Sequence, residues 1–339
     1  MPGVNLLRFN YTTADWVVYA PLRKLRPTHG TSLTHRSSDP LRDTKEFCPF
    51  CPGNEKMTPP EIYAIRPGGS AGNWSVRVVP NKFPALRIEE DPKRHEEGEM
   101  FHWMAGCGAH EVVIEAPDHT PIMQQPLAQI ELTLKTLQSR YLDLKRDKRF
   151  RSIIVFKNHG EGAGTSIRHP HWQIIATPVI PRLLSLECYQ AAEYFNRTGN
   201  CLYRVMLDEE LAAKNRLIAA NDQFVAFVPY AASLPFETWI LPRLAQASWT
   251  TMQPQQIRPF AEILKTVLLK LYDALENPDF NLTVDMVPTG DDDKEYFLWH
   301  VRVLPRLSTP AGFELGSGMS INTTMPEEAA AFLRDGDGR

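Results

Sequence analysis

The chain of 339 residues repeats one order of expected structural elements in its two halves. In each half, two apolar strands precede an amphipathic helix, a third apolar strand, a polar turn and a last strand with polar side chains. The elements of the first half are residues 76–84, 111–115, 127–145, 153–156 and 169–176, and those of the second are 224–230, 236–242, 255–275, 280–286 and 297–304. This order predicts an α+β fold made by tandem duplication, with antiparallel sheets packed against helices. We place the halves at residues 1–190 and 191–339.

Two segments outside this repeat carry further expectations. Residues 1–73 are rich in proline and polar residues, and we expect them to be irregular and to lie over the first half. Asp279 and Phe280 are expected in a surface turn.

The overall composition excludes several classes of protein. A formal net charge of -3 argues against a general nucleic-acid-binding protein, which would carry a basic surplus. The sequence has neither a secretory signal pattern nor an unbroken apolar stretch of membrane-spanning length, so we expect a cytoplasmic protein without a membrane partner. Its five cysteines are an odd number, which does not suit a disulfide framework, and we expect reduced thiols.

Two histidines stand at alternate positions in the run from His169 to Gln173. The apolar residues that follow predict a buried strand, and its period of two directs His169, His171 and Gln173 to one face. One histidine can bind a metal ion while the other attacks phosphorus. The alternative is a histidine pair that only forms hydrogen bonds within a core.

A glycine-rich turn, residues 158–166, leads into this strand. Glycines such as Gly164 let backbone N–H groups approach a phosphate closely, and Asn158 and Ser166 can donate hydrogen bonds to its oxygens. Many glycine-rich loops are only turns. Next to a candidate nucleophile, however, this one predicts a phosphate site.

Cys48 and Cys51 have the two-residue spacing of a zinc knuckle, in which two thiolates from a tight turn bind one tetrahedral ion. A redox pair is an alternative, but it would need the second cysteine to open a helix, which Pro52 and Gly53 disfavour. A turn that merely contains two cysteines is the third possibility.

Together these motifs resemble the galactose-1-phosphate uridylyltransferase family, the duplicated branch of the histidine-triad superfamily. The resemblance extends over nearly the whole chain, through residues 16–21 with Arg23 and Arg26, then 48–51, 81–83, 117–119, 158–173 and 228–242, and His300 before Pro305.

The resemblance implies a double-displacement nucleotidyl transfer from a nucleoside-diphosphate hexose to a hexose 1-phosphate or inorganic phosphate. His171 would form a covalent nucleotidyl-imidazole, with Gln173 and Ser166 donating to the phosphate oxygens. Further residues would bind the nucleotide and phosphate: Arg23, Arg26, Asn81, Phe83, Asn158 and Gly164. Relatives of this kind are commonly homodimers.

The resemblance also implies one structural zinc ion per chain, bound by Cys48, Cys51, His119 and His169. His110 is the rival to His119 as a ligand. Some family members carry a second metal held by a glutamate and three histidines. Here Arg302 stands where one of these histidines is expected, so we predict no second metal, with Arg302 paired with Glu187 or facing a substrate phosphate.

Residues 312–322 look closer to relatives that phosphorolyse ADP-glucose than to the galactose enzymes, and the form of the phosphate loop agrees. The base, the hexose and the acceptor remain open between UDP-glucose and ADP-glucose chemistry. Two other functions compete: a histidine-triad hydrolase, which Gln173 disfavours because that branch has a third histidine there, and a non-catalytic nucleotide sensor.

Overall fold

The computed structural model describes residues 5–21, 23, 47–69 and 73–336. Its main element is one ten-stranded sheet that runs through both halves, in the order β10-β11-β12-β14-β13-β8-β9-β7-β4-β3, with every neighbouring pair antiparallel. The strands are β3 (Tyr63–Ile65), β4 (Val76–Pro80), β7 (Ala109–Ile114), β8 (Ser152–His159), β9 (His171–Thr177), β10 (Leu217–Ala220), β11 (Phe224–Phe227), β12 (Thr238–Pro242), β13 (Phe280–Asp285) and β14 (His300–Pro305). The predicted antiparallel α+β fold is confirmed, but the expected sheets are joined into one.

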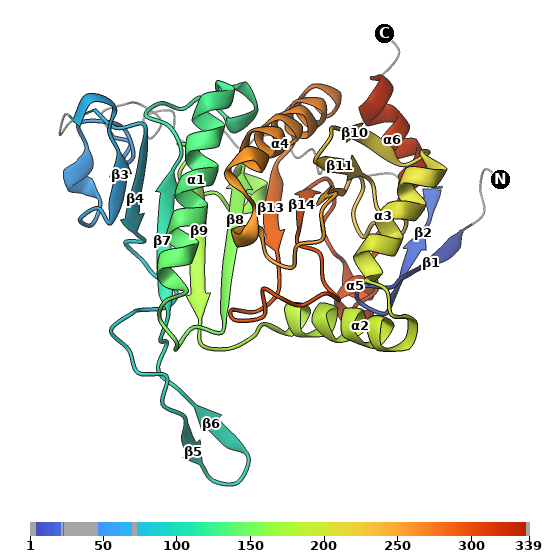
Figure 1. Ribbon diagram of the computed structural model, residues 1–339, viewed down its shortest axis with the longest axis horizontal. Coiled ribbons are helices and arrows are strands. Elements are labelled where there is room, and N and C mark those ends of the chain that lie inside the picture. Colours follow the sequence, from blue (N-terminus) through green and yellow to red (C-terminus); the bar gives the residue numbers. More distant parts are fainter. Residues whose placement is uncertain (1–4, 22, 24–46, 70–72, 337–339) are drawn as a thin grey trace.

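The two halves meet at β8 and β13, which pair with Asn158 opposite Asn281. On either side of this seam the strands follow in mirrored order, as a duplicated unit with a pseudo-twofold axis would place them (Figure 1). Phe280 opens β13 and is 1% exposed, so the expected surface turn at Asp279 and Phe280 is wrong for Phe280. Phe280 is the first apolar residue of the run 280–286, and such a residue is as consistent with the start of a strand as with the end of a turn.

One face of the sheet is covered by the two long amphipathic helices. Helix α1 (Leu127–Leu144) packs on the strands of the first half and α4 (Pro254–Ala274) on those of the second. Their apolar residues and the inward side chains of the strands form one continuous core through both halves. Both helices agree with the predicted ranges to within a residue at each end.

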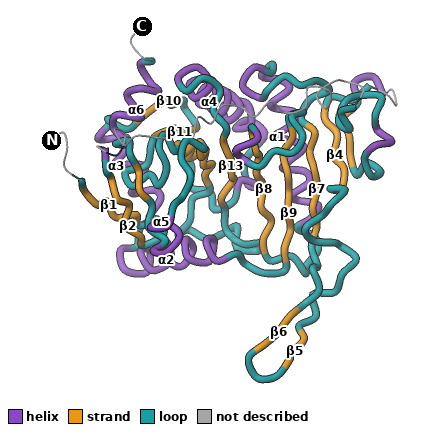
Figure 2. Tube along the Cα trace, turned by 180° about the vertical axis from the view of Figure 1, so that it is seen from behind, coloured by secondary structure: helices purple, strands orange, loops and turns teal. Residues whose placement is uncertain are grey.

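The opposite face is covered differently in the two halves. In the first half, the turn with Cys48, Phe50 and Cys51 packs on Val112 and Ile114 of β7. In the second half, α2 (Arg182–Thr198) and α3 (Leu202–Ala213) pack on β11 and β12. Figure 2 shows this side with β4, β7, β9 and β8 in view. The sequence did not lead us to expect α2 or α3.

The N-terminal hairpin lies on the second half and not, as expected, on the first. Strands β1 (Leu6–Asn10) and β2 (Asp15–Tyr19) form a small sheet with β15 (Ile321–Asn322), next to α5 (Gly312–Ser317) and α6 (Pro326–Asp335). Arg8 donates to Glu327 at 3.0 Å, and Tyr19 donates to the carbonyl of Ala232 at 2.8 Å. The expectation that residues 1–73 are irregular is wrong for β1, β2 and β3, because proline and polar content reports neither short strands nor long-range partners.

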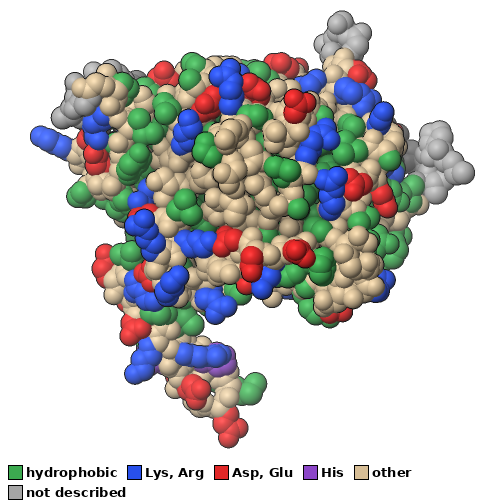
Figure 3. Space-filling model, viewed as in Figure 1, with side chains coloured by type: hydrophobic (Ala, Val, Ile, Leu, Met, Phe, Trp, Pro, Cys, Tyr) green, Lys and Arg blue, Asp and Glu red, His purple; other side chains and the backbone are tan. Residues whose placement is uncertain are grey.

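A hairpin arm, β5 (His95–Glu97) and β6 (Phe101–Trp103), projects from the body (Figure 1). Met100 is 78% exposed and Phe101 72%. On the face in Figure 3, side chains of both charges lie among hydrophobic ones and the arm stands clear of the body. None of the helices in the described ranges is both long and apolar enough to span a bilayer.

Candidate active site

A cavity of about 490 Å³ lies at the end of β8 and at the start of β9. Its walls come from both halves: the loop after β8 and the histidine run of the first half, together with Asn277 and Asp279 of the second. His171 lies in this wall and is 7% exposed. The structure therefore brings the glycine-rich loop and the candidate nucleophile to one cavity.

The ring of His171 is held with one nitrogen directed into the protein. Its Nδ1 donates to the carbonyl of His169 at 2.8 Å, which leaves Nε2 without the proton. Phe50 packs edge-on against the ring, with centroids 5.3 Å apart. Burial lowers the pKa of His171 to about 4, so the imidazole is neutral near pH 7 and Nε2 has a free lone pair.

A buried ion pair that the sequence did not reveal supports the backbone of His171. Lys157 and Glu115 are 1% and 0% exposed, and Lys157 Nζ donates to Glu115 Oε2 at 3.0 Å and to the carbonyl of His171 at 3.3 Å. Burial lowers the pKa of Lys157, and Glu115 opposes this. The sequence did hold one indication of this pair: Lys157 directly follows the apolar residues 153–156, and an ammonium buried there without a partner would be costly.

The glycine-rich loop has the backbone that phosphate binding requires, but not all its side chains turn to the cavity. Gly160 and Gly164 have positive φ angles of 84° and 86°. Asn158 lines the cavity, and so does Thr165, whose buried hydroxyl has no partner among the described residues. Ser166, the predicted donor, is exposed and does not belong to the cavity wall. Thr165 is thus a candidate that sequence reasoning missed.

Gln173 follows His171 on the same face of β9, and His110 fixes its side chain. His110 Nδ1 accepts the backbone N–H of Ala85 at 3.2 Å, so Nε2 carries the proton and donates to Gln173 Oε1 at 2.8 Å. The Gln173 amino group has no hydrogen-bond partner among the described residues, but Gln173 is not part of the cavity wall. Asn81 Nδ2 lies 3.1 Å from the same His110 nitrogen, but two donors cannot hydrogen-bond to each other, so this contact is not a hydrogen bond when Nε2 carries the proton.

The remaining predicted nucleotide residues are dispersed. Phe83 is 84% exposed at the edge of the first half, and Arg23 is also exposed. Asn81 lines a second cavity of about 440 Å³ together with His110. Arg26 lies outside the described residues.

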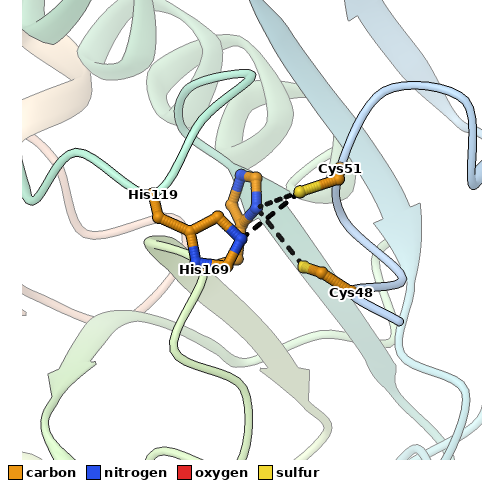
Figure 4. A group of neighbouring side chains, drawn as sticks. All are labelled: Cys48, Cys51, His119 and His169. Carbon is orange, nitrogen blue, oxygen red and sulfur yellow. Dashed lines mark hydrogen bonds between the residues drawn. The ribbon is translucent and has the colours of Figure 1, made fainter. Parts of the chain in front are cut away.

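Two thiols and two imidazoles meet behind the histidine run (Figure 4). One possible ligand atom from each of Cys48, Cys51, His119 and His169 lies within 4.8 Å of the others. His169 Nε2 donates to the carbonyl of Ala116 at 2.8 Å, so its Nδ1 faces the thiols. Metal-bound histidines commonly donate their other ring N–H in this way, which fixes the ring with the remaining nitrogen toward the metal.

The four residues fit a tetrahedral metal ion, while His110, the rival ligand, lies with Gln173 instead. His169 does not belong to β9, which begins at His171. The prediction that both histidines lie on one face of a strand is therefore wrong. His169 precedes the strand and faces the cysteines, whereas His171 begins the strand and faces the cavity.

Arg302 lies away from this cavity, in a buried cluster of residues from α2, β13 and β14. Its guanidinium contacts Glu187 at 3.3 Å and Asp285 at 2.6 Å. Of the two expectations, the structure has the pair with Glu187 and gives Arg302 no place in the cavity wall. Asp285, the second carboxylate of this cluster, was not among the predicted site residues.

Models of the two domains of galactose-1-phosphate uridyl transferase match nearly the whole chain: the N-terminal domain matches residues 3–181 and the C-terminal domain residues 187–334. The chain belongs to the galactose-1-phosphate uridylyltransferase family. Its members are nucleotidyltransferases, so the predicted family and enzyme class are both confirmed.

Several relatives within the galactose-1-phosphate uridylyltransferase family align over nearly their full lengths. An ADP-glucose phosphorylase of Arabidopsis thaliana is 31% identical over 97% of this chain and 92% of its own. A galactose-1-phosphate uridylyltransferase of Thermotoga maritima is 27% identical over 97% and 98%. A crystal structure of an Arabidopsis thaliana ADP-glucose phosphorylase with bound ADP-glucose superimposes with a TM-score of 0.83, at 29% identity, covering 98% of this chain and 99% of that one.

The Arg302 cluster gives this member of the uridylyltransferase family an expected pH dependence of stability. His300 is fully buried and stacks on Trp239. Its Nε2 has no hydrogen-bond partner in the described part of the chain, and Asp285 Oδ2 lies 3.9 Å from it. Burial lowers the pKa of His300 from 6.5 to about 4. The folded state therefore resists a proton that the unfolded state accepts, so this stability is complete above pH 6.5 and is lost as the pH falls toward 4.

The free energy of unfolding should fall between pH 7 and pH 4.5 in both the wild type and His300→Phe. We expect the fall to be smaller in His300→Phe by on the order of 2 kcal/mol. Urea unfolding at the two pH values measures this. Other buried histidines contribute equally to both proteins and cancel in the comparison. Equal losses in both proteins would contradict the assignment.

Proposed function

We propose that the chain transfers a nucleoside monophosphate from a nucleoside-diphosphate hexose to a phosphate acceptor through a nucleotidyl group on His171. The observation that carries this proposal is the neutral imidazole whose Nε2 is free in the wall of a cavity formed with a phosphate-type loop. The family of the chain supports it.

In the first step, the Nε2 lone pair attacks the α-phosphorus, and the bond from that phosphorus to the bridging oxygen breaks. The hexose 1-phosphate leaves with the bond electrons. In the second step, an oxygen of the acceptor phosphate attacks the same phosphorus, and the P–N electrons return to His171. No net proton is required on the imidazole, which suits a ring kept neutral by burial.

The amino groups of Asn158 and Gln173 are proposed to donate to the oxygens of the α-phosphate, where negative charge increases during transfer. Gly164 and the loop backbone would lie close to the same phosphate, with Ser166 or the better placed Thr165 as a hydroxyl donor. We keep Arg23, Arg26, Asn81 and Phe83 as proposed nucleotide contacts, with exposed Phe83 and Arg23 able to meet a base or phosphate at the surface.

Cys48, Cys51, His119 and His169 are proposed to bind one zinc ion. Two thiolates and two imidazoles form a closed set, so the ion would supply a structural crosslink. Its position couples it to catalysis: Phe50 stands between the two cysteines in sequence and packs on His171. We propose that the second metal is absent because the guanidinium of Arg302 already pairs with both Glu187 and Asp285.

Among the possible substrates we propose ADP-glucose and inorganic phosphate, giving ADP and glucose 1-phosphate. The relative named for this reaction shares 31% of its residues with this chain, compared with 27% for the Thermotoga maritima uridylyltransferase. Uridylyl transfer between UDP-glucose and galactose 1-phosphate is the second candidate, favoured by the breadth of uridylyltransferase relatives.

A substrate panel tests this choice: ADP-glucose with phosphate, UDP-glucose with phosphate, and UDP-glucose with galactose 1-phosphate, each followed by mass spectrometry of the products. We expect the first pair to turn over at least about tenfold faster than the others, which corresponds to 1.4 kcal/mol of discrimination. Faster reaction of the third pair would make the chain a uridylyltransferase. Release of free AMP or UMP without an acceptor would indicate a hydrolase, and no turnover a sensor.

Three further expectations remain proposals. The halves are divided at residues 190 and 191, a boundary that falls within α2 although this helix packs on the second half. The chain works in the cytoplasm, where its five thiols would stay reduced. It forms a homodimer, which would cover the exposed apolar side chains of the β5–β6 arm, because a two-stranded hairpin is only marginally stable in water.

A further inference from the structure

The second half of the chain holds the phosphate loop of the first half through three consecutive contacts. Asn277 Oδ1 lies 2.8 Å from His159 Nε2, Asp279 Oδ2 accepts the N–H of Gly162 at 2.6 Å, and Asn281 Nδ2 contacts Asn158 and Ala163. The Asp279 carboxylate fills the space beside Gly160, where an added Cβ would come within 1.7 Å of Oδ1. The loop therefore takes its shape from residues 277–281, which none of the sequence motifs includes.

Asn281 also determines which way the Asn158 carboxamide points. Asn281 Nδ2 lies 2.8 Å from the carbonyl oxygen of Ala163 and 2.9 Å from Asn158 Oδ1. A backbone carbonyl can only accept, so the Asn281 atom between them must be the amino nitrogen. An amino nitrogen donates, so the Asn158 atom that faces it must be the oxygen. The network itself thus fixes both amides.

The other end of the Asn158 amide is then its amino group. This Nδ2 lies beside Gly164, 3.9 Å from where a Cβ on that glycine would stand, and Asn158 lines the cavity with His171. The described residues offer Nδ2 no hydrogen-bond acceptor. With the opposite orientation, an oxygen would face an incoming phosphate and repel it.

We propose that Asn281 is a positioning residue for nucleotidyl transfer: it binds Asn158 Oδ1 and so presents the Asn158 amino group to the α-phosphate. This inference rests on the proposed function, because it assumes that a phosphate occupies the cavity. Asn281 itself does not touch the reacting atoms. Its contribution depends on the presence of the Asn158 side chain.

A double-mutant cycle tests this dependence. We expect Asn281→Leu, which keeps the size but removes both donors, to slow formation of the nucleotidyl-His171 adduct by about 10-fold or more, because a misaligned donor loses much of its transition-state stabilisation. The KM for the nucleotide sugar should change by less than about threefold, since the interaction strengthens mainly in the transition state. Rapid-quench mass spectrometry of the intact protein measures the adduct rate.

The decisive comparison is made in the Asn158→Ala background. If Asn281 acts through Asn158, adding Asn281→Leu should slow the single Asn158→Ala variant by less than about twofold. If the role of Asn281 is purely structural, Asn281→Leu should slow adduct formation in the Asn158→Ala variant by the same factor as in the wild type. Thr283→Val, on the same face of β13 but bonded to Asp285, is the matched control and should keep the wild-type adduct rate.

The outcomes separate the two levels of the argument. Additive losses, or a wild-type adduct rate in Asn281→Leu, would overturn the role of Asn281 while leaving the proposed function intact. A wild type that forms no adduct and turns over no nucleotide sugar would overturn the proposed function and this inference with it. Thermal unfolding of each variant identifies losses that arise from misfolding.

Discussion

Replacing His171 with alanine is expected to reduce turnover by at least about 10⁴-fold, the scale on which enzymes lose activity when their covalent nucleophile is removed. The expectation follows from the geometry: Nδ1 of His171 is committed to the His169 carbonyl, and only Nε2 can attack. Steady-state rates with the best substrate pair measure the loss. Intact-protein mass spectrometry should show the nucleotidyl adduct in the wild type and none in the variant.

His95→Ala is the matched control for this experiment, because His95 is an exposed histidine on the projecting arm. It should retain the adduct and its rate. Residual turnover above about one tenth of the wild-type value in His171→Ala would exceed what binding and electrostatic stabilisation alone supply, and would refute the covalent mechanism.

Replacing Cys51 with serine is expected to have the largest effect on stability. Structural zinc contributes its binding energy to folding, so losing a thiolate ligand should cost on the order of 5 kcal/mol. Elemental analysis should find about one zinc per wild-type chain and well under half of that in the variant. Activity should fall as well, because the turn that carries Phe50 supports the His171 ring.

Cys201→Ser serves as the control for the metal experiment. Cys201 is a partly buried thiol whose Sγ lies 3.3 Å from the carbonyl of Tyr296, remote from the four clustered ligands. It should keep both the metal content and nearly the wild-type unfolding temperature. Equal zinc content and stability in Cys51→Ser would show that the four residues form only a hydrogen-bonded core.

The sequence predicted α1 and α4 best, gave strand boundaries less well and did not reveal α2 or α3. The apolar period of 3.6 over residues 127–145 and 255–275 is long enough to specify helix type and length, and α1 and α4 follow it closely. Phe297, Leu298 and Trp299 were expected within a strand, but β14 begins at His300. Their apolar character reports burial, which all three have, and not the ladder of hydrogen bonds that defines a strand.

In the site, local motifs were predictable and their long-range supports were not. The spacing of Cys48 and Cys51 indicated a metal turn, but the strand period placed His169 and His171 on one face, whereas β9 begins only at His171. The burial of Lys157 is explained only by its ion pair with Glu115. The orientation of the Asn158 carboxamide is explained only by Asn281, 123 positions away in the chain. Partners at such separations come together only through sheet topology, which periodicity does not encode.

The pairing of β8 with β13 also bears on how such a protein can have originated and how it can be divided. A single half produced alone would expose an entire unpaired strand at this seam, an edge that invites aggregation. Two separately expressed halves are therefore expected to recover by edge-to-edge complementation, and an ancestor with only one unit would have needed a second molecule to complete its sheet.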